Sequence, residues 1–142
     1  MGILLDPHAL LHPPGEGVLS SGTGPSGELP RKTEKPWGHE LLWAWGSRYA
    51  AKILHIEAGH RLSLQYHRVK EETLLLICGR LALELEGPAG SIEQHVALPG
   101  QVFHILPGRK HRMAALETCD VLEVSSPELE DLVRLQDDFG RT

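Results

Sequence analysis

The chain has 142 residues, and this length predicts a single domain, because single domains commonly contain about 100–200 residues. Its formal net charge is −5 at pH 7, so the composition gives no electrostatic reason to expect nucleic acid or an anionic membrane as a partner. Hydrophobic residues make up 41% of the chain, yet no apolar run approaches the roughly 20 residues that a membrane span requires.

Nine histidines stand beside only two Phe and two Tyr, and this excess is the first chemical signal in the sequence. The two cysteines, Cys78 and Cys119, lie inside apolar runs, which favours buried thiols in a reducing compartment over a disulfide framework. The first residues lack the basic start of a signal peptide. We therefore expect a cytoplasmic protein without a membrane or nucleic-acid partner, and the histidine excess remains to be explained.

The N-terminal residues differ in composition from the rest of the chain. Glycine and proline are dense throughout residues 1–30, and this density opposes regular secondary structure. We expect residues 1–33 to form an extended arm and residues 34–142 to form the folded domain. The apolar side chains of the arm would dock on a partner subunit, or the arm would be a flexible tail, and both interpretations are open at this point.

The central part of the chain, residues 35–125, consists of short apolar runs separated by turn residues. The runs are about one strand long and follow one another at roughly 8–12 residues, which favours an all-β sandwich or barrel. Alternation is clearest at Leu81, Leu83 and Leu85, whose side chains share one face of a strand. The glycines and proline of residues 87–90 then predict the loop of a β-hairpin.

In the C-terminal segment, the spacing of the apolar residues changes from that of a strand to that of a helix. Ser126 is a suitable N-cap, Pro127 suits the first helical position, and acidic residues follow near the positive end of the helix dipole. Leu129, Leu132 and Val133 are spaced as on a helix. These features predict a short C-terminal helix, about residues 127–134, that docks on the barrel.

One stretch combines strand alternation with side chains that bind metals. Gln65 and His67 are two residues apart, so their side chains lie on the same face of a strand. Glu72 opens the next strand after a short turn, and His111 follows a second turn that contains glycine. One amide oxygen, two imidazoles and one carboxylate suit a divalent transition metal, with water completing the shell and leaving room for a substrate.

These residues resemble the two motifs of the cupin superfamily, small β-barrels built from two histidine-bearing hairpins. His67 and Glu72 match ligands of the first motif, whereas Gln65 stands where many cupins carry their first histidine. The second motif matches at Gly100, Gly108 and His111. The resemblance therefore supports Gln65, His67, Glu72 and His111 as the metal ligands.

Four segments narrow the resemblance, and they occur in order at residues 35–38 (KPWG), 62–67 (LSLQYH), 110–112 (KHR) and 132–141 (LVRLQDDFGR). Together they are similar to the type II mannose-6-phosphate isomerase domain, and the match covers residues 34–141. The resemblance implies a single-domain cupin, a double-stranded β-helix or jelly-roll barrel, that binds a sugar phosphate and interconverts aldose and ketose. It implies a divalent metal ion, with zinc as the first expectation and manganese, iron or nickel as alternatives.

Roles for the surrounding cations follow from the same reasoning. Lys52 matches a lysine of the family ahead of the first motif, and we expect it to act on the substrate or to transfer a proton. Lys110 and Arg141 join Lys52 as candidate catalytic residues, and the candidate substrate-binding residues are Lys70, Arg109, His104 and His60. The type II pattern usually has arginine where this chain has Lys70, and lysine cannot bind a phosphate in the bidentate manner.

Two functions of different classes are open at this stage. The first is a metal-dependent sugar-phosphate isomerase, and the alternative is a non-catalytic or regulatory cupin that binds a sugar or another metabolite at the same metal. We also expect a homodimer, because unpaired sheet edges need to be covered and small cupins commonly pair through an edge strand.

Overall fold

The structure, a computed structural model, describes residues 23–24 and 27–142. The arm predicted for residues 1–33 lies largely outside these residues, so its docking and the homodimer stay predictions. The described strands are β1 (Thr23–Gly24), β2 (Gly27–Glu28), β3 (Arg31–Lys35), β4 (Gly38–Trp45), β5 (Ala50–Ile56), β6 (Leu64–Tyr66), β7 (Glu72–Glu86), β8 (Ile92–Ala97), β9 (Val102–Ile105), β10 (His111–Ser125) and β11 (Val133–Gln136).

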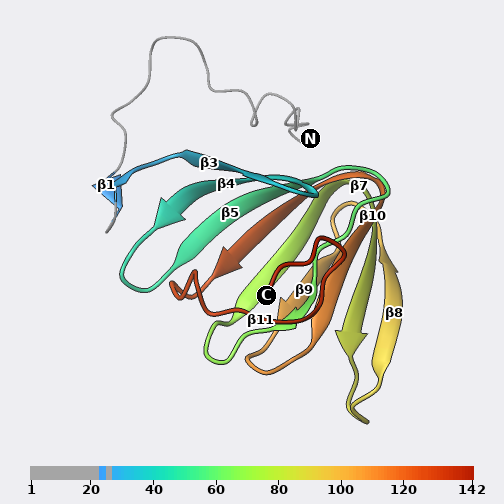
Figure 1. Cartoon of the computed structure of the whole chain (residues 1–142). Coiled ribbons are helices and arrows are strands. Elements are labelled where there is room, and N and C mark those ends of the chain that lie inside the picture. Colours follow the sequence, from blue (N-terminus) through green and yellow to red (C-terminus); the bar gives the residue numbers. More distant parts are fainter. Residues whose placement is uncertain (1–22, 25–26) are drawn as a thin grey trace.

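Strands β3 to β11 form one antiparallel sheet that curls into a half-barrel (Figure 1). One path through the sheet runs β11-β6-β10-β5-β4-β3, and β7 pairs with β10, β8 and β9. The two longest strands, β7 and β10, pair with each other from one end to the other and so join the two halves of the sheet. The all-β architecture predicted by the strand-length runs is confirmed.

The hydrophobic core lies on the concave face of the sheet, where alternate residues of each strand point inward. In the first half of β7 the buried leucines are Leu74 and Leu76, and in the second half they are Leu81, Leu83 and Leu85. The inward positions thus change from even to odd numbers along one strand. This change falls at Gly79, where the register against β10 also shifts. An irregularity of this kind lets one strand serve both halves of the barrel.

The predicted C-terminal helix is wrong, since no helix occurs in residues 27–142. Two tight turns, Leu129 N–H to Pro127 O and Asp131 N–H to Glu128 O, are followed by strand β11 instead. The helix does not form because the carbonyl and carboxylate of Asp131 accept hydrogen bonds from residues 67–70. A helix of about eight residues is marginal by itself, so these tertiary contacts decide the conformation.

The sheet begins before residue 34, where the folded domain is predicted to start, because β3 begins at Arg31 and pairs with β4.

The two cysteines are free, with Cys119 buried and Cys78 half-buried. In the described part of the chain, no helix has the length and apolar character needed to cross a membrane.

Gly79 provides a test of the strand geometry. Its φ is +89°, and a Cβ atom there would lie 2.2 Å from the carbonyl oxygen of Thr118 on β10. Gly90, with a φ of +82° and no atom within 4 Å, is the matched control. Gly90→Ala should lower the free energy of unfolding by about 1–2 kcal/mol, the usual strain of a left-handed alanine. Gly79→Ala should lower it by clearly more in urea denaturation, and equal losses would contradict this packing.

Candidate metal centre

Three buried side chains from separate segments meet at one point inside the half-barrel. His67 follows β6, Glu72 opens β7 and His111 opens β10. The Nε2 atoms of His67 and His111 lie 3.3 Å and 3.1 Å from the same oxygen, Oε1 of Glu72. All three residues are at most 3% exposed, and they form the one His, Cys, Asp and Glu cluster of metal-binding geometry within the described residues.

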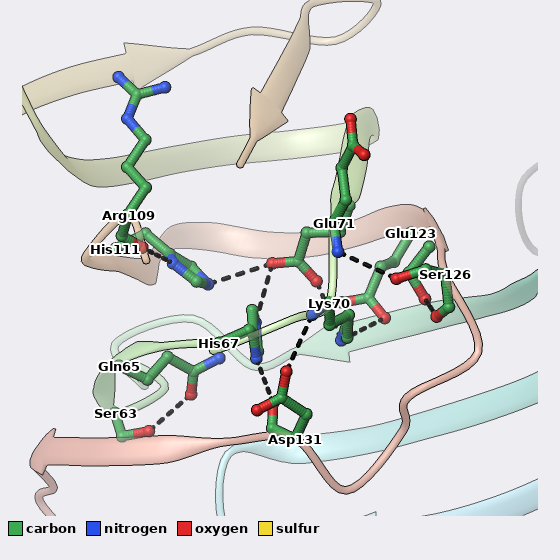
Figure 2. Close-up of polar contacts among 12 residues, drawn as sticks. Ser63, Gln65, His67, Lys70, Glu71, Arg109, His111, Glu123, Ser126 and Asp131 are labelled. Atoms are coloured by element: carbon green, nitrogen blue, oxygen red, sulfur yellow. Dashed lines mark hydrogen bonds and ion pairs between the residues drawn. The ribbon is translucent and has the colours of Figure 1, made fainter. Parts of the chain in front are cut away.

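The backbone fixes which nitrogen of each imidazole carries the proton. Nδ1 of His67 lies 2.6 Å from the carbonyl oxygen of Asp131, and Nδ1 of His111 lies 2.9 Å from the carbonyl oxygen of Arg109. A carbonyl oxygen only accepts hydrogen bonds, so Nδ1 must be the donor in both rings. In the neutral imidazoles, Nε2 therefore presents a lone pair toward Glu72 (Figure 2).

This arrangement fits a cation and is unfavourable without one. Neither Nε2 atom has a hydrogen-bond partner among the residues that the structure describes. Two nitrogen lone pairs and a carboxylate oxygen face one another in a buried space, where unpaired polar atoms are costly. Histidines that donate Nδ1–H to a carbonyl and leave Nε2 free are the usual form of histidine ligands to zinc and related metals. The donor set of His67, Glu72 and His111 thus suits a divalent transition metal.

Gln65, the fourth predicted ligand, lies next to this cluster. It pairs with His111 across β6 and β10, and directly opposed residues of an antiparallel pair place their side chains side by side. Its Oε1 accepts a hydrogen bond from Ser63 Oγ at 2.7 Å, and the side chain lines the same cavity as His67. Its role as a ligand stays a prediction.

A second layer of charge lies behind Glu72. The Nζ atom of Lys70 is 3.0 Å from Oε2 of Glu72 and 3.5 Å from Oε2 of Glu123, and all three side chains are buried. Burial opposes the ionisation of Glu72, but positive charge around its carboxylate outweighs burial and holds its pKa well below the usual range. With both imidazoles neutral, the Lys70 ammonium is the group that supplies this charge. Burial, reinforced by the Glu72 charge, raises the pKa of Glu123 to about 7. Glu72 is therefore an ionised ligand.

A cavity of about 400 Å³ opens beside His67, a size within the range of roughly 300–1,000 Å³ that is typical of small-molecule sites. Its walls come from β3, β4, β5, β6, β10 and the C-terminal segment, residues 126–142. Charged side chains dominate the lining, and they are Lys35, Glu40, Lys52, Lys70, Glu123, Glu130, Arg134 and Arg141. A polar ligand with several hydroxyl groups and a negative charge suits such a lining.

Of the predicted catalytic and substrate-binding residues, Lys52, Lys70 and Arg141 line this cavity. Lys52 binds Glu40 with 3.2 Å between Nζ and Oε1, and it pairs with Glu123 across β5 and β10. Arg141 forms an ion pair with Asp137, with 2.7 Å between its Nη2 and Oδ1. These three cations therefore reach the cavity with carboxylate partners already in place.

The other predicted cations and histidines lie away from the cavity. Lys110 is half-exposed beside Glu86, and Arg109 donates to the carbonyl oxygens of Glu86 and His104, with its guanidinium pointing away from His67 in Figure 2. His104 pairs with Glu71 at the exposed surface, and His60 is exposed and contacts the carbonyl of Ala58. None of these four, Lys110, Arg109, His104 and His60, is among the residues that line the cavity.

The sequence prediction lacks several residues of the site, among them Glu123, Asp131 and Arg134. Glu123 had a detectable signal, because it alternates with Val121 and Ser125 and so occupies an inward position of a strand. The sequence pattern places Asp131 inside the predicted helix of residues 127–134, whereas in the structure its backbone and side chain hold residues 67–70. Arg134 lies on β11, and recognising its position required the strand that the helix prediction replaced.

Comparison with known proteins gives distant relatives in sequence. No protein-family model matches the chain. It is 28% identical over 115 residues to a mannose-1-phosphate guanylyltransferase of Salmonella montevideo and 30% identical over 117 residues to the xanthan biosynthesis protein XanB of Xanthomonas campestris pv. campestris. These matches cover 78% and 79% of this chain but 24% of each relative, so the chain spans about a quarter of the length of the curated relatives it matches.

Solved structures give the fold. KdgF from Halomonas sp. superposes with a TM-score of 0.63 at 21% identity, covering 71% of this chain and 91% of that chain. Oxalate decarboxylase from Bacillus subtilis superposes with a TM-score of 0.68 at 16% identity, covering 80% and 32%. The half-barrel has the cupin fold. In sequence, the chain is distantly homologous to part of the guanylyltransferase relatives, the type II mannose-6-phosphate isomerase cupin region, and the resemblance predicted from the motifs is confirmed.

Lys70 gives a test of the buried charges. Lys70→Met should lower the free energy of unfolding of the metal-free protein by about 3–5 kcal/mol at pH 7, because Glu72 and Glu123 lose their common cation. Lys32→Met removes an exposed ion pair to Glu34 and should cost less than about 1 kcal/mol. Urea denaturation measures both changes. A Lys70→Met loss as small as that of the control would contradict a buried, charged cluster.

Proposed function

We propose that the protein is a metal-dependent sugar-phosphate isomerase that interconverts an aldose and a ketose, in the manner of a mannose-6-phosphate isomerase. One observation carries the proposal: the free Nε2 atoms of His67 and His111 converge on ionised Glu72 beside a cavity lined with cations. The relatives support a sugar phosphate as the class of substrate, because the names of several refer to mannose 1-phosphate and the chain is similar to part of each.

The residues of this chain divide the chemical work between them. His67, Glu72 and His111 would hold the metal, and Gln65 is placed to be a further ligand. A divalent metal bound there would act as a Lewis acid that polarises the carbonyl group of the sugar. The isomerisation moves a proton between C2 and C1 of the sugar, and this step needs a positioned acid–base group. We assign it to Lys52, whose half-buried ammonium is held at the cavity by Glu40.

The phosphate group requires a cation with donors to spare. Arg134 lines the cavity, and its Nε is buried without a hydrogen-bond partner in the described part of the chain. Arg141 lies on the same wall with its guanidinium against Asp137. Because arginine binds phosphate through parallel N–H donors, we propose that Arg134 and Arg141 hold the phosphate.

The second candidate function is a non-catalytic or regulatory cupin that binds a sugar or another metabolite at the same metal. One feature favours it: Glu40 holds both Lys35 and Lys52, and Asp137 holds Arg141, so a phosphate competes with carboxylates already in place. The two functions share the metal centre and differ in whether bound sugar is converted.

Turnover separates the two functions. We expect the metal-loaded protein to exchange mannose 6-phosphate and fructose 6-phosphate, and a chelator should abolish the exchange. Lys52→Ala should lower kcat by about 100-fold or more, as for the loss of an acid–base group. His95→Ala, on the exposed part of β8, is the control and should leave the rate unchanged. Protein that binds metal and sugar but converts no hexose or pentose phosphate would exclude the isomerase and support the binding function.

A further inference from the structure

We propose that Asp131 is a positioning residue for the metal centre, through which the C-terminal segment sets the affinity for the metal. The inference rests on the metal-binding part of the proposed function and is independent of isomerase activity. Asp131 lies 64 residues from His67 along the chain, yet its backbone contacts that ligand and its side chain contacts the loop between both first-motif ligands.

The backbone carbonyl of Asp131 acts on His67 directly. It accepts the Nδ1–H of His67 over 2.6 Å, and this bond fixes the orientation of the ring and leaves Nε2 free to face Glu72. On the other side of His67, its own carbonyl accepts the N–H of Gly108 at 2.7 Å. The ligand is therefore held between the second motif and the C-terminal segment.

The carboxylate of Asp131 acts on the loop of residues 68–71, which connects His67 to Glu72. Oδ1 accepts the backbone N–H of Arg68 at 3.0 Å, and Oδ2 accepts those of Val69 and Lys70 at 2.6 Å and 2.8 Å. Figure 2 shows Asp131 against the backbone of this loop, below His67 and Lys70. Three consecutive donors on one carboxylate leave the loop little freedom, so the spacing between the two ligands is set from outside the motif.

The C-terminal segment is itself anchored to the strand that precedes His67. In β11, Val133 pairs with Tyr66 and Arg134 pairs with Gln65 of β6. Closer to the loop, the N–H of Glu71 donates to Ser126 Oγ, and the N–H of Ser126 donates to the Glu71 carbonyl, both at 3.0 Å. Asp131 therefore sits between two attachment points, and a shift of this segment would move His67 and the loop together.

The test compares zinc affinities of three full-length variants, measured by competition with a chromophoric chelator. Asp131→Ala should raise the Kd for zinc by about 10–100-fold, the usual effect of losing a group that orients a metal ligand. Asp131→Asn should fall between Asp131→Ala and the wild type, because one amide oxygen can still accept at the Oδ2 position while the amide NH₂ opposes the N–H of Arg68. Asp138→Ala is the control, since it removes the exposed pair with Arg61 from the same segment and should leave the Kd unchanged.

A merely structural role would lower the stability of the variants without changing the zinc affinity of the folded protein. The second readout is therefore the ¹⁵N NMR spectrum of the histidines. Asp131→Ala keeps the carbonyl that accepts from His67 but loses the side-chain bonds that hold this carbonyl in place, so it should lower the population of the Nδ1–H tautomer of His67 and leave that of His111 unchanged. An unchanged Kd in folded Asp131→Asn, an equal loss in Asp138→Ala, or wild-type protein that binds no zinc would overturn the proposal. Wild-type protein that binds zinc but lacks turnover would overturn only the isomerase.

Discussion

The metal centre depends on two hydrogen bonds, from Nδ1 of His67 and from Nδ1 of His111 to backbone carbonyls, whose geometry is unfavourable unless a cation is bound. Two backbone carbonyls, of Asp131 and Arg109, place the imidazole protons on Nδ1, so the Nε2 lone pairs of His67 and His111 converge on a carboxylate oxygen. In a buried space this concentration of electron density is costly unless a cation shares it. The fold maintains this arrangement, because a rotation of either imidazole away from Glu72 would break its hydrogen bond to a backbone carbonyl.

The sheet supplies the rigidity that this arrangement requires. Strands β7 and β10 pair along their whole length, so Glu72 and His111, which open these two strands, are fixed by the ladder. His67 has no such ladder, because β6 is a strand of three residues. Its position comes instead from Gly108 on one side and Asp131 on the other. The metal centre thus joins two ligands held by strands to a third ligand held by loops.

The sequence predicted what local pattern encodes and missed what long-range contacts decide. Alternation and turn residues predicted the strands, and the i, i+2 spacing and motif order predicted His67, Glu72 and His111 as a cluster. The segment of residues 127–134 has good helix-start chemistry, but its Asp131 serves the loop of residues 68–71, and that contact is invisible to a local rule. Lys110 is next to His111 in sequence, yet it lies in the turn before β10 and pairs with Glu86 at the surface.

The central claim is that His67, Glu72 and His111 hold a divalent metal through Nε2. Anomalous diffraction from crystals grown with zinc tests it most directly, because the chain has nine histidines and only two of them belong to this cluster. The account predicts one strong peak at about 2.0–2.2 Å from both Nε2 atoms and from a carboxylate oxygen of Glu72. No peak at this position, or peaks only at other histidines such as the stacked pair His39 and His55, would contradict it.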